Sequence, residues 1–290
     1  MTLRAVTVTH QTPELQDAFI EYVPKVFPSV SFRRWRDVGA WDDGYAAFSF
    51  MEGDRIVASA SRQRMDIVLQ GERMRAWQLT AVGTLPEWRR RGLQHQIMHR
   101  VLEATPRDDM FFVFGNGSVL EFYPRFGFER HREHFFRAPH TVVPSGAPLR
   151  ELDFESAADR ALVLRLAASA EPVTTGFGVR DHGRIALWYW TNLFPSAFRY
   201  LPEMDAIIVA VQTGELLEIY DVLAAKQIDL APALPRIATA LVSQLEFGFT
   251  PDRYWPSATP HHENIEGPLF VRAGYRMPEG PFKFPKLGET

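Results

Sequence analysis

The apolar and polar positions of the first 140 residues predict a mixed α/β unit. Residues 3–9 alternate as a strand does, and the apolar positions of residues 14–27 recur at helical spacing. A short helix, three strands divided by turn residues, a helix, a buried strand, a short helix and a last strand follow. In this order they cover residues 31–38, 46–51, 55–69, 73–85, 93–104, 110–116, 118–126 and 127–137.

The same order of elements begins again after a segment without periodicity. Residues 138–148 are rich in proline and other turn-forming residues, which is typical of a linker. A strand, two helices, three strands and a further helix over residues 233–247 are predicted beyond it. We therefore expect two tandem units, residues 1–140 and 149–290.

The connections between these elements indicate how the strands pair. Strands joined by tight turns pair antiparallel, whereas strands joined through a helix pair parallel. The fold class expected is α/β with mixed α+β sheets. Each unit is expected to hold a mainly antiparallel sheet with helices on both faces.

Composition excludes several classes of protein. The chain has 22 phenylalanines, 7 tryptophans and a net charge of only −3, which argues against disorder. It has no cysteine, which excludes disulfides and thiolate chemistry and fits a reducing compartment. No apolar run approaches the roughly 20 residues that span a bilayer, and no basic stripe typical of nucleic-acid binding is present. A cytoplasmic protein without membrane or nucleic-acid partners is expected.

Residues 82–103 carry the most informative local pattern. A strand leads through a short loop into a helix that starts near Gly92. Unpaired amides and the positive end of the helix dipole make such a start a site for anions, and glycine lets a phosphate approach the backbone. Arg89, Arg90 and Arg91 add charge that can pair with phosphate oxygens. The loop lacks the glycine and lysine pattern of P-loops and dinucleotide-binding turns.

This stretch resembles the acetyl-coenzyme A motif of the GNAT N-acetyltransferases, R/Q-x-x-G-x-G/A. Arg89 and Gly92 match it, and Gln94 stands where the family has a small residue. The sequence NGSVLEFYPRFGF, residues 116–128, resembles the family's second motif at the expected distance. With its two tandem units, the chain resembles in particular the enhanced intracellular survival family of acetyltransferases. It would be a shorter relative that lacks the family's third, sterol-carrier-like domain.

The resemblance implies acetyl-CoA as cosubstrate and no metal. It implies that backbone groups on the strand before the cradle bind the pantetheine arm, that the loop and helix start hold the pyrophosphate, and that the second motif touches the far side of the cofactor. These three sets are Val82, Gly83 and Thr84; Arg90, Arg91, Gly92, Leu93, Gln94 and His95; and Asn116, Ser118 and Val119.

Tyr123 aligns with the family's general acid. A phenol has an ordinary pKa near 10, close to that of a thiol, so proton donation to the leaving thiolate is chemically sensible. The base stays open, because the strand over residues 73–82 carries no carboxylate. The candidates are the terminal carboxylate of Thr290, which is the base in the three-domain relatives, the side chains of Asp42 and Asp43, and a water chain.

The function expected is transfer of an acetyl group to a primary amine by direct attack in a ternary complex. The acceptor is a small-molecule or peptide amine, and a homo-oligomer is possible. The alternatives are a CoA-binding sensor without turnover and, with less support, an aminoacyl transferase. The second unit is expected to be degenerate, because residues 223–232 replace the cradle with no glycine and one lysine.

Overall fold

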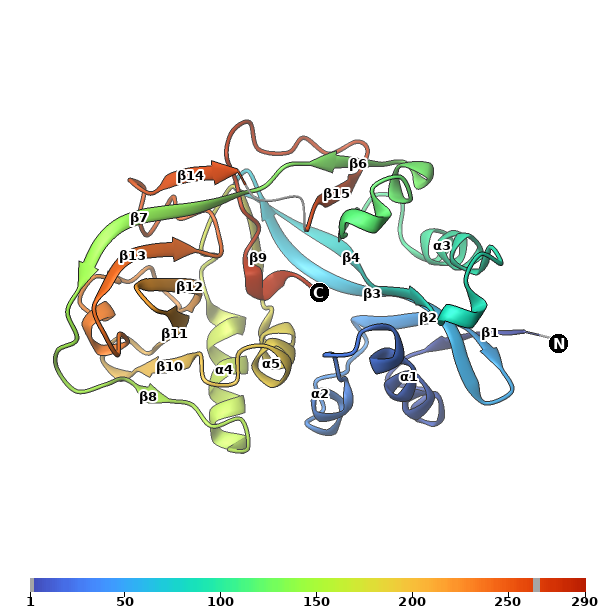
Figure 1. The fold of residues 1–290 in the computed structure, drawn as a ribbon, viewed down its shortest axis with the longest axis horizontal. Helices are drawn as coiled ribbons and strands as arrows, with labels where there is room; N and C mark the ends of the chain where they lie inside the picture. The colour runs from blue at the N-terminus through green and yellow to red at the C-terminus, as the bar shows by residue number, and fades with distance from the viewer. Residues whose placement is uncertain (1–2, 263–266) are drawn as a thin grey trace.

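The computed structural model describes residues 3–262 and 267–290 and contains two β-sheets with helices packed around them (Figure 1). The first sheet has the strand order β1-β2-β3-β4-β5-β15-β6, and β9 pairs with the end of β3 that lies away from β2. Its strands are β1 (Arg4–Val8), β2 (Tyr45–Glu52), β3 (Arg55–Leu69), β4 (Glu72–Thr84), β5 (Met110–Phe114), β6 (Phe128–His131), β9 (Phe177–Arg180) and β15 (Leu269–Arg272).

The second sheet has the strand order β14-β7-β13-β12-β11-β10-β8. Its strands are β7 (His134–Val142), β8 (Arg150–Glu151), β10 (Phe198–Leu201), β11 (Ala206–Thr213), β12 (Leu216–Leu223), β13 (Val242–Phe247) and β14 (Thr259–His262). Within the described ranges, only β4 with β5 and β12 with β13 pair parallel. The expected fold class, two mixed and mainly antiparallel sheets with helices, is confirmed.

Helices cover both faces of the first sheet, with α1 and α2 on one side and α3 on the other (Figure 1). The helices are α1 (Pro13–Val26), α2 (Arg33–Asp37), α3 (Leu93–Ala104), α4 (Ala157–Ser169) and α5 (Gly183–Asn192). Proline in the first turn of α1 is tolerated because its missing N–H would have no helical partner there. The periodic apolar residues of α3, such as Ile97 and Val101, are fully buried, as an amphipathic helix requires. Within the residues described, no helix is long and apolar enough to cross a membrane.

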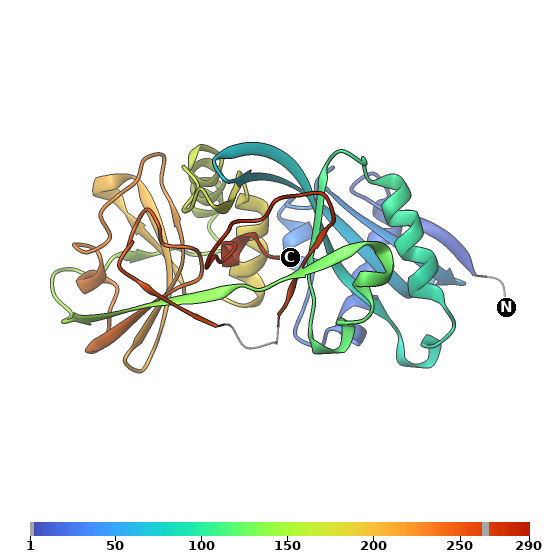
Figure 2. The same ribbon diagram turned by 90° about the horizontal axis from the view of Figure 1, so that it is seen from above.

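The two halves of the sequence exchange strands. β7 follows β6 directly in the chain but belongs to the second sheet, and it runs from one unit to the other in Figures 1 and 2. β9 and β15 come from the second half and complete the first sheet. Phe177 of β9 packs against Phe112 of β5 and Phe284 of the C-terminal segment, so a single core cluster joins both halves. The division into units at residues 140 and 149 stays a prediction.

The helix predicted over residues 233–247 is wrong. Leu234–Arg236 forms one 3-10 turn, and Val242–Phe247 forms β13, which pairs parallel with β12. Val242, Leu245 and Phe247 are buried on β13, so tertiary pairing outweighs the apparent helical spacing.

The strand predicted over residues 127–137 is divided into β6 and β7. The chain leaves the first sheet at Glu133, whose side chain is buried. Its carboxylate accepts hydrogen bonds from the backbone N–H of Phe284 (2.7 Å) and from Lys283 Nζ (3.1 Å). A buried charge with specific partners therefore marks a break that the apolar pattern alone does not show.

Candidate active site

The parallel strands β4 and β5 part before β4 ends. Their pairing stops at Leu79 opposite Val113, whereas β4 continues to Thr84. Ala81 has a φ of 48°, which non-glycine residues rarely adopt, and the register of β4 against β3 shifts at the neighbouring position. The bulge turns the end of β4 away from β5 and leaves backbone groups without a β5 partner.

A cavity of about 230 Å³ lies at this opening. Its walls combine the end of β4, the segment after β5, the loop after α1, and two residues from the second half, Trp188 and Thr290. The lining residues are Phe27, Val30, Phe32, Leu79, Thr80, Ala81, Val82, Val113, Phe114, Gly115, Asn116, Val119, Tyr123, Trp188 and Thr290. Val82, Asn116, Val119 and Tyr123, which the resemblance singles out, are thus brought together.

The predicted phosphate cradle forms a second hollow beside the start of α3. Gly92 precedes the helix with a φ of 74° and no side chain caps the helix, so its first amides stay available. A side-chain carbon built at Gly92 would meet no atom within 4 Å, so the space beside this glycine is open. The hollow is lined by Thr84, Trp88, Arg89, Arg90, Gly92, Leu93, Gln94, His95 and Phe122. Arg91 is not among the lining residues, but its guanidinium lies 4.4 Å from the ring centre of Trp88, which is.

Gln94, which stands at the family's small-residue position, turns inward. Its amide donates to the backbone carbonyl of Gly83 and to that of Ser59 (3.0 Å). The Gly83 carbonyl also accepts from the hydroxyl of Tyr22 at 2.6 Å. The cradle thus accommodates a long side chain by tying α3 to β4 and β3, and the carbonyl of Gly83 is already engaged within the protein.

Gly83 is required by the packing of α1 on β4. A side-chain carbon at this position would lie 2.3 Å from Val26 Cγ1, inside any normal contact distance. Gly83→Ala is therefore expected to lower the free energy of unfolding by about 1–3 kcal/mol, the usual range for overpacking. Chemical denaturation measures this effect.

Gly117→Ala is the matched control for Gly83→Ala, because an added carbon at Gly117 meets nothing within 4 Å. Its stability is expected to stay within about 0.5 kcal/mol of wild type. Equal stabilities of the two variants would contradict the close contact between α1 and β4.

Tyr123 begins a short 3-10 turn and is almost fully buried at the cavity wall. Its ring packs against Phe270 of β15 at a centroid distance of 5.3 Å. Burial raises the pKa of the Tyr123 phenol above its ordinary value of 10. The hydroxyl therefore stays protonated through the neutral range and can serve as a proton donor.

Thr290 reaches the same cavity from the second half of the sequence. Its backbone N–H and its hydroxyl both donate to Oε1 of Gln78, at 2.5 and 2.8 Å. Gln78 is fully buried on β4, and its amide nitrogen donates to the carbonyl of Gly288 at 2.8 Å. The sequence indicated Thr290 as a candidate but gave no sign that Gln78 holds it.

The two aspartates considered as bases lie away from Tyr123. Asp42 pairs with Arg184 at 2.9 Å, and Asp43 pairs with Arg64 at 3.2 Å. Arg64 lowers the pKa of Asp43 through its hydrogen bonds and charge. Neither aspartate lines the cavity that contains Tyr123.

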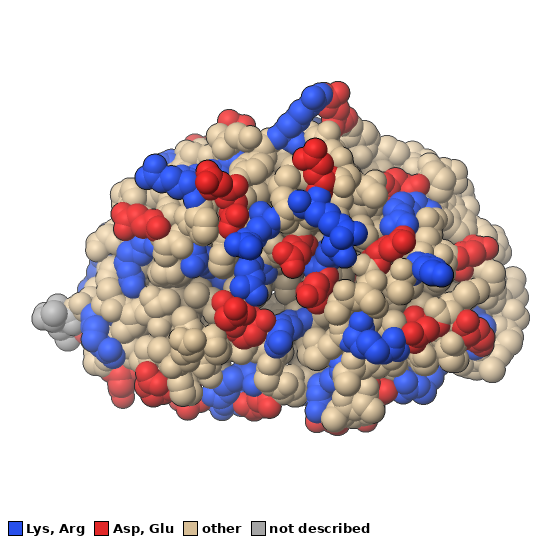
Figure 3. Space-filling view, turned by 180° about the vertical axis from the view of Figure 1, so that it is seen from behind, with Lys and Arg blue, Asp and Glu red and all other residues tan. Residues whose placement is uncertain are grey.

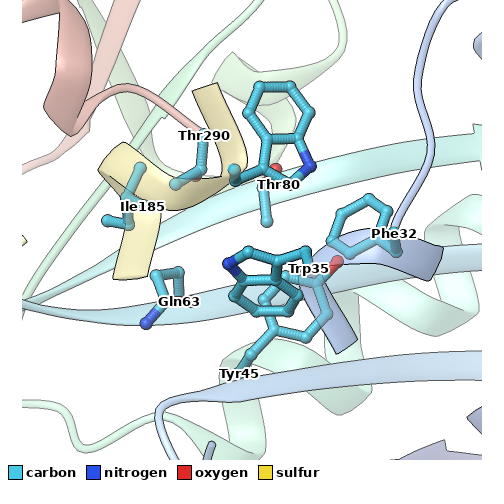
Figure 4. Close-up of a pocket in the computed structure, with 8 residues that line it drawn as sticks. Phe32, Trp35, Tyr45, Gln63, Thr80, Ile185 and Thr290 are labelled. Atoms are coloured by element: carbon cyan, nitrogen blue, oxygen red, sulfur yellow. The ribbon is translucent and has the colours of Figure 1, made fainter. Parts of the chain in front are cut away.

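A small aromatic pocket continues from the cavity toward α5. It shares Phe32, Thr80, Trp188 and Thr290 with the cavity. Figure 4 shows the rings of Phe32, Trp35 and Tyr45 on one side, with Ile185 of α5 and Thr290 on the other. Trp190 of α5 is buried, whereas Trp188, two positions earlier on the same helix, lines the pocket.

The remaining predicted residues lie near the opening. Ser118 belongs to the 3-10 turn Gly117–Val119, but its side chain is outside the described part of the structure. His95 and His99 contact each other with ring centroids 4.6 Å apart. In the described ranges, no group of three His, Cys, Asp or Glu side chains is placed to hold a metal ion. On the face in Figure 3, positive and negative side chains are interspersed.

Comparisons with known proteins agree with this geometry. Residues 10–131 match the family model described as acetyltransferase (GNAT) domain. A search of curated proteins found no match.

Three solved structures are similar over both sheets. A GCN5-related N-acetyltransferase from Kribbella flavida is 18% identical with a TM-score of 0.54, over 93% of this chain and 70% of that one. Eis1 from Mycobacterium abscessus is 16% identical with a TM-score of 0.53, over 92% and 73%. A GCN5-related N-acetyltransferase from Anabaena variabilis is 14% identical with a TM-score of 0.53, over 92% and 72%. At these identities the likeness shows a shared fold.

The family match, the parted strands and the shared fold confirm the resemblance expected from the sequence. The chain carries a GNAT acetyltransferase domain in residues 10–131 and is an acyltransferase whose fold resembles that of Eis1.

Proposed function

We propose that the protein transfers an acetyl group from acetyl-CoA to a primary amine by direct attack in a ternary complex. The observation that carries the proposal is the opening between β4 and β5, because the unpaired end of β4 lines the cavity at Val82 and the cradle at Thr84. The cradle suits a pyrophosphate, and the unpaired end of β4 suits a pantetheine arm. Bound acetyl-CoA would supply the activated acetyl group.

Groups of the chain would stabilise the negative charge that develops during this transfer and would move its protons. The amine nitrogen forms a bond to the thioester carbon while the carbon–sulfur bond breaks. An amide at the end of β4, near Val82, would stabilise the negative oxygen of the tetrahedral intermediate. Tyr123 would donate its proton to the departing thiolate.

The attacking amine must also lose a proton, and Thr290 is placed best for this. Of the three candidate residues, it alone lines the cavity with Tyr123. In a chain that ends at Thr290, the carboxylate of this residue would accept the proton directly or through water. A chain extended by two glycines after Thr290 should then lose most of its turnover and keep its affinity for acetyl-CoA, and equal turnover would point to water or another base.

Calorimetric titration with acetyl-CoA, followed by CoA, tests the function as a whole. One site per chain with micromolar affinity is expected, together with release of CoA that depends on an added primary amine. No binding would reject the acetyltransferase. Two sites would mean that the second unit also holds a cofactor.

Gly92→Glu tests the location of the cofactor site. The new carboxylate would stand where the phosphates bind and would repel them, so acetyl-CoA affinity should fall by at least about 100-fold. Calorimetry measures this loss.

Gly39→Glu serves as the control, because Gly39 also has a positive φ and open space but lies far from the cradle in the sequence. Its affinity for acetyl-CoA should match that of wild type. Normal binding by Gly92→Glu would place the cofactor elsewhere.

A further inference from the structure

In the described part of the chain, no charged side chain lines the cavity at Tyr123. The polar residues in its wall, Thr80, Asn116, Tyr123 and Thr290, all have side chains that are neutral at pH 7. Tyr123 is included, because burial raises the pKa of its phenol. A charged group brought against these side chains would lose its water and would find no oppositely charged side chain among them.

One part of this wall comes from neither the strands nor the motifs assigned to acetyl-CoA. Phe27, Val30 and Phe32 belong to the loop between α1 and α2, and Trp188 belongs to α5. The rings of Phe32 and Trp188 lie with their centroids 6.2 Å apart, so the loop and the helix meet at the cavity. Apart from Thr290, this part of the wall is entirely apolar or aromatic. It is the part left for the acceptor.

Apolar surface stays accessible on this part of the wall. Phe32 is fixed, since it is 5% exposed and its ring meets that of Trp35 edge-on at a centroid distance of 5.6 Å. Phe27, Val30 and Trp188 are only half-buried. An apolar group placed against them would remove their remaining surface from water, which favours binding. The wall therefore suits an acceptor whose amine is carried by an apolar group.

The uncharged surroundings also favour the reactive form of the amine. Only a neutral amine has the lone pair that attacks the thioester carbon. Apolar surroundings disfavour the ammonium form and so lower the pKa of the bound amine. Thr290, the candidate that would accept the proton, lines the same cavity. The cavity thus provides for one amine and offers no charged side chain for a second ionic group.

We propose that the acceptor is a primary monoamine carried by a compact aromatic or aliphatic group, and that Phe32 and Trp188 select it by packing against that group. This rests on the proposed acetyl transfer and leaves its bond-forming and proton-transfer steps unchanged. The volume of about 230 Å³, part of which the acetyl end of the cofactor would fill, favours a compact group. Diamines and amino acids with a free carboxylate would be poor acceptors.

Three amines that differ in one substituent test the proposal. Benzylamine carries no second ionic group, 4-(aminomethyl)benzylamine adds an ammonium at the opposite end of the ring, and 4-(aminomethyl)benzoate adds a carboxylate there. With wild type, the kcat/KM for benzylamine should exceed that for each charged analogue by at least about tenfold, because a desolvated charge without a partner weakens binding. An equal or higher kcat/KM for either charged analogue would overturn the proposal and leave the acetyltransferase standing.

Trp188→Glu should shift the preference toward the diamine. The new carboxylate would pair with the second ammonium, so the ratio of kcat/KM for benzylamine to that for 4-(aminomethyl)benzylamine should fall by at least about tenfold, mainly through KM. Leu193→Glu is the control, because Leu193 lies just after α5, is 47% exposed and does not line the cavity. An unchanged ratio in Trp188→Glu would overturn the proposal. If melting temperatures show that Trp188→Glu is unfolded, Val30→Glu in the half-buried loop carries the same test.

A binding measurement separates this proposal from the proposed function. With CoA bound, benzylamine should raise the melting temperature of wild type more than either charged analogue does. This order without acetylation of any amine would support the apolar acceptor wall and reject the acetyltransferase. Equal shifts for the three amines, or no shift with benzylamine in a protein that binds CoA, would reject the apolar acceptor wall whether or not another amine is acetylated.

Discussion

Lys283→Ala is expected to destabilise the protein by about 3–5 kcal/mol, the usual consequence of removing one partner from a buried ion pair. Lys283 is 6% exposed, and its Nζ lies 3.1 Å from carboxylate oxygens of both Glu133 and Glu289. Glu133 is equally buried, so the variant leaves negative charge in the interior with less compensation. Urea denaturation at pH 7 measures the loss.

The same ion pairs link the C-terminal segment to the strand exchange. Glu133 marks the point where the chain passes from β6 to β7, and Glu289 lies next to Thr290 in the sequence. Burial alone would raise the pKa of Glu289, but Lys283 and Lys286 hold it below its ordinary value of 4.5. Since this pKa is lowered in the folded state, its contribution to stability is present at pH 7 and is lost as the pH falls below about 4.5.

Lys226→Ala is the control for Lys283→Ala. Lys226 is exposed, so its removal should change the free energy of unfolding by less than about 0.5 kcal/mol. A loss below about 1 kcal/mol for Lys283→Ala would show that the buried ion pairs do not hold the C-terminal segment in place.

Local patterns predicted most of the first unit, because its strands and helices follow one another as neighbours. The helix that begins after Gly92 and the strand that ends at Thr84 lie within two residues of the predicted limits. The strand exchange could not be predicted from the sequence, because β9 and β15 are short and their partners β3 and β5 lie more than 100 residues away in the chain. Pairing between such distant segments leaves no periodic signal.

The residues of the candidate site also differ in how far the sequence could predict them. The cradle and Tyr123 could be predicted because contiguous motifs carry them, and the structure places these motifs at two hollows beside the end of β4. Trp188 lines the cavity at Tyr123 from α5, where it contacts Phe32, a residue more than 100 positions away in the sequence. The second half of the sequence therefore contributes walls to the candidate site, whereas the predicted cofactor motifs lie wholly in the first half.

Tyr123→Phe is expected to lower kcat by about 100-fold or more, the usual loss when a general acid is removed, and to leave the affinity for acetyl-CoA within about twofold. The phenyl ring keeps the packing against Phe270 and removes only the hydroxyl. Because burial raises the pKa of Tyr123 above 10, ionisation of this phenol should not reduce the wild-type rate between pH 7 and about 9. Steady-state rates of CoA release, with the best acceptor of a primary-amine screen, measure both effects.

Tyr275→Phe is the control for Tyr123→Phe, because it removes a tyrosine hydroxyl that has no proposed catalytic role. The Tyr275 hydroxyl donates to the backbone carbonyl of Asp108 at 2.9 Å and lines none of the hollows described above. Its removal should leave kcat within about twofold of wild type, since no reacting atom is near it. If Tyr123→Phe were equally active, the thiolate would take its proton from water. Tyr123 would then be a wall of the cavity, held there by its contacts with Phe270 and its neighbours.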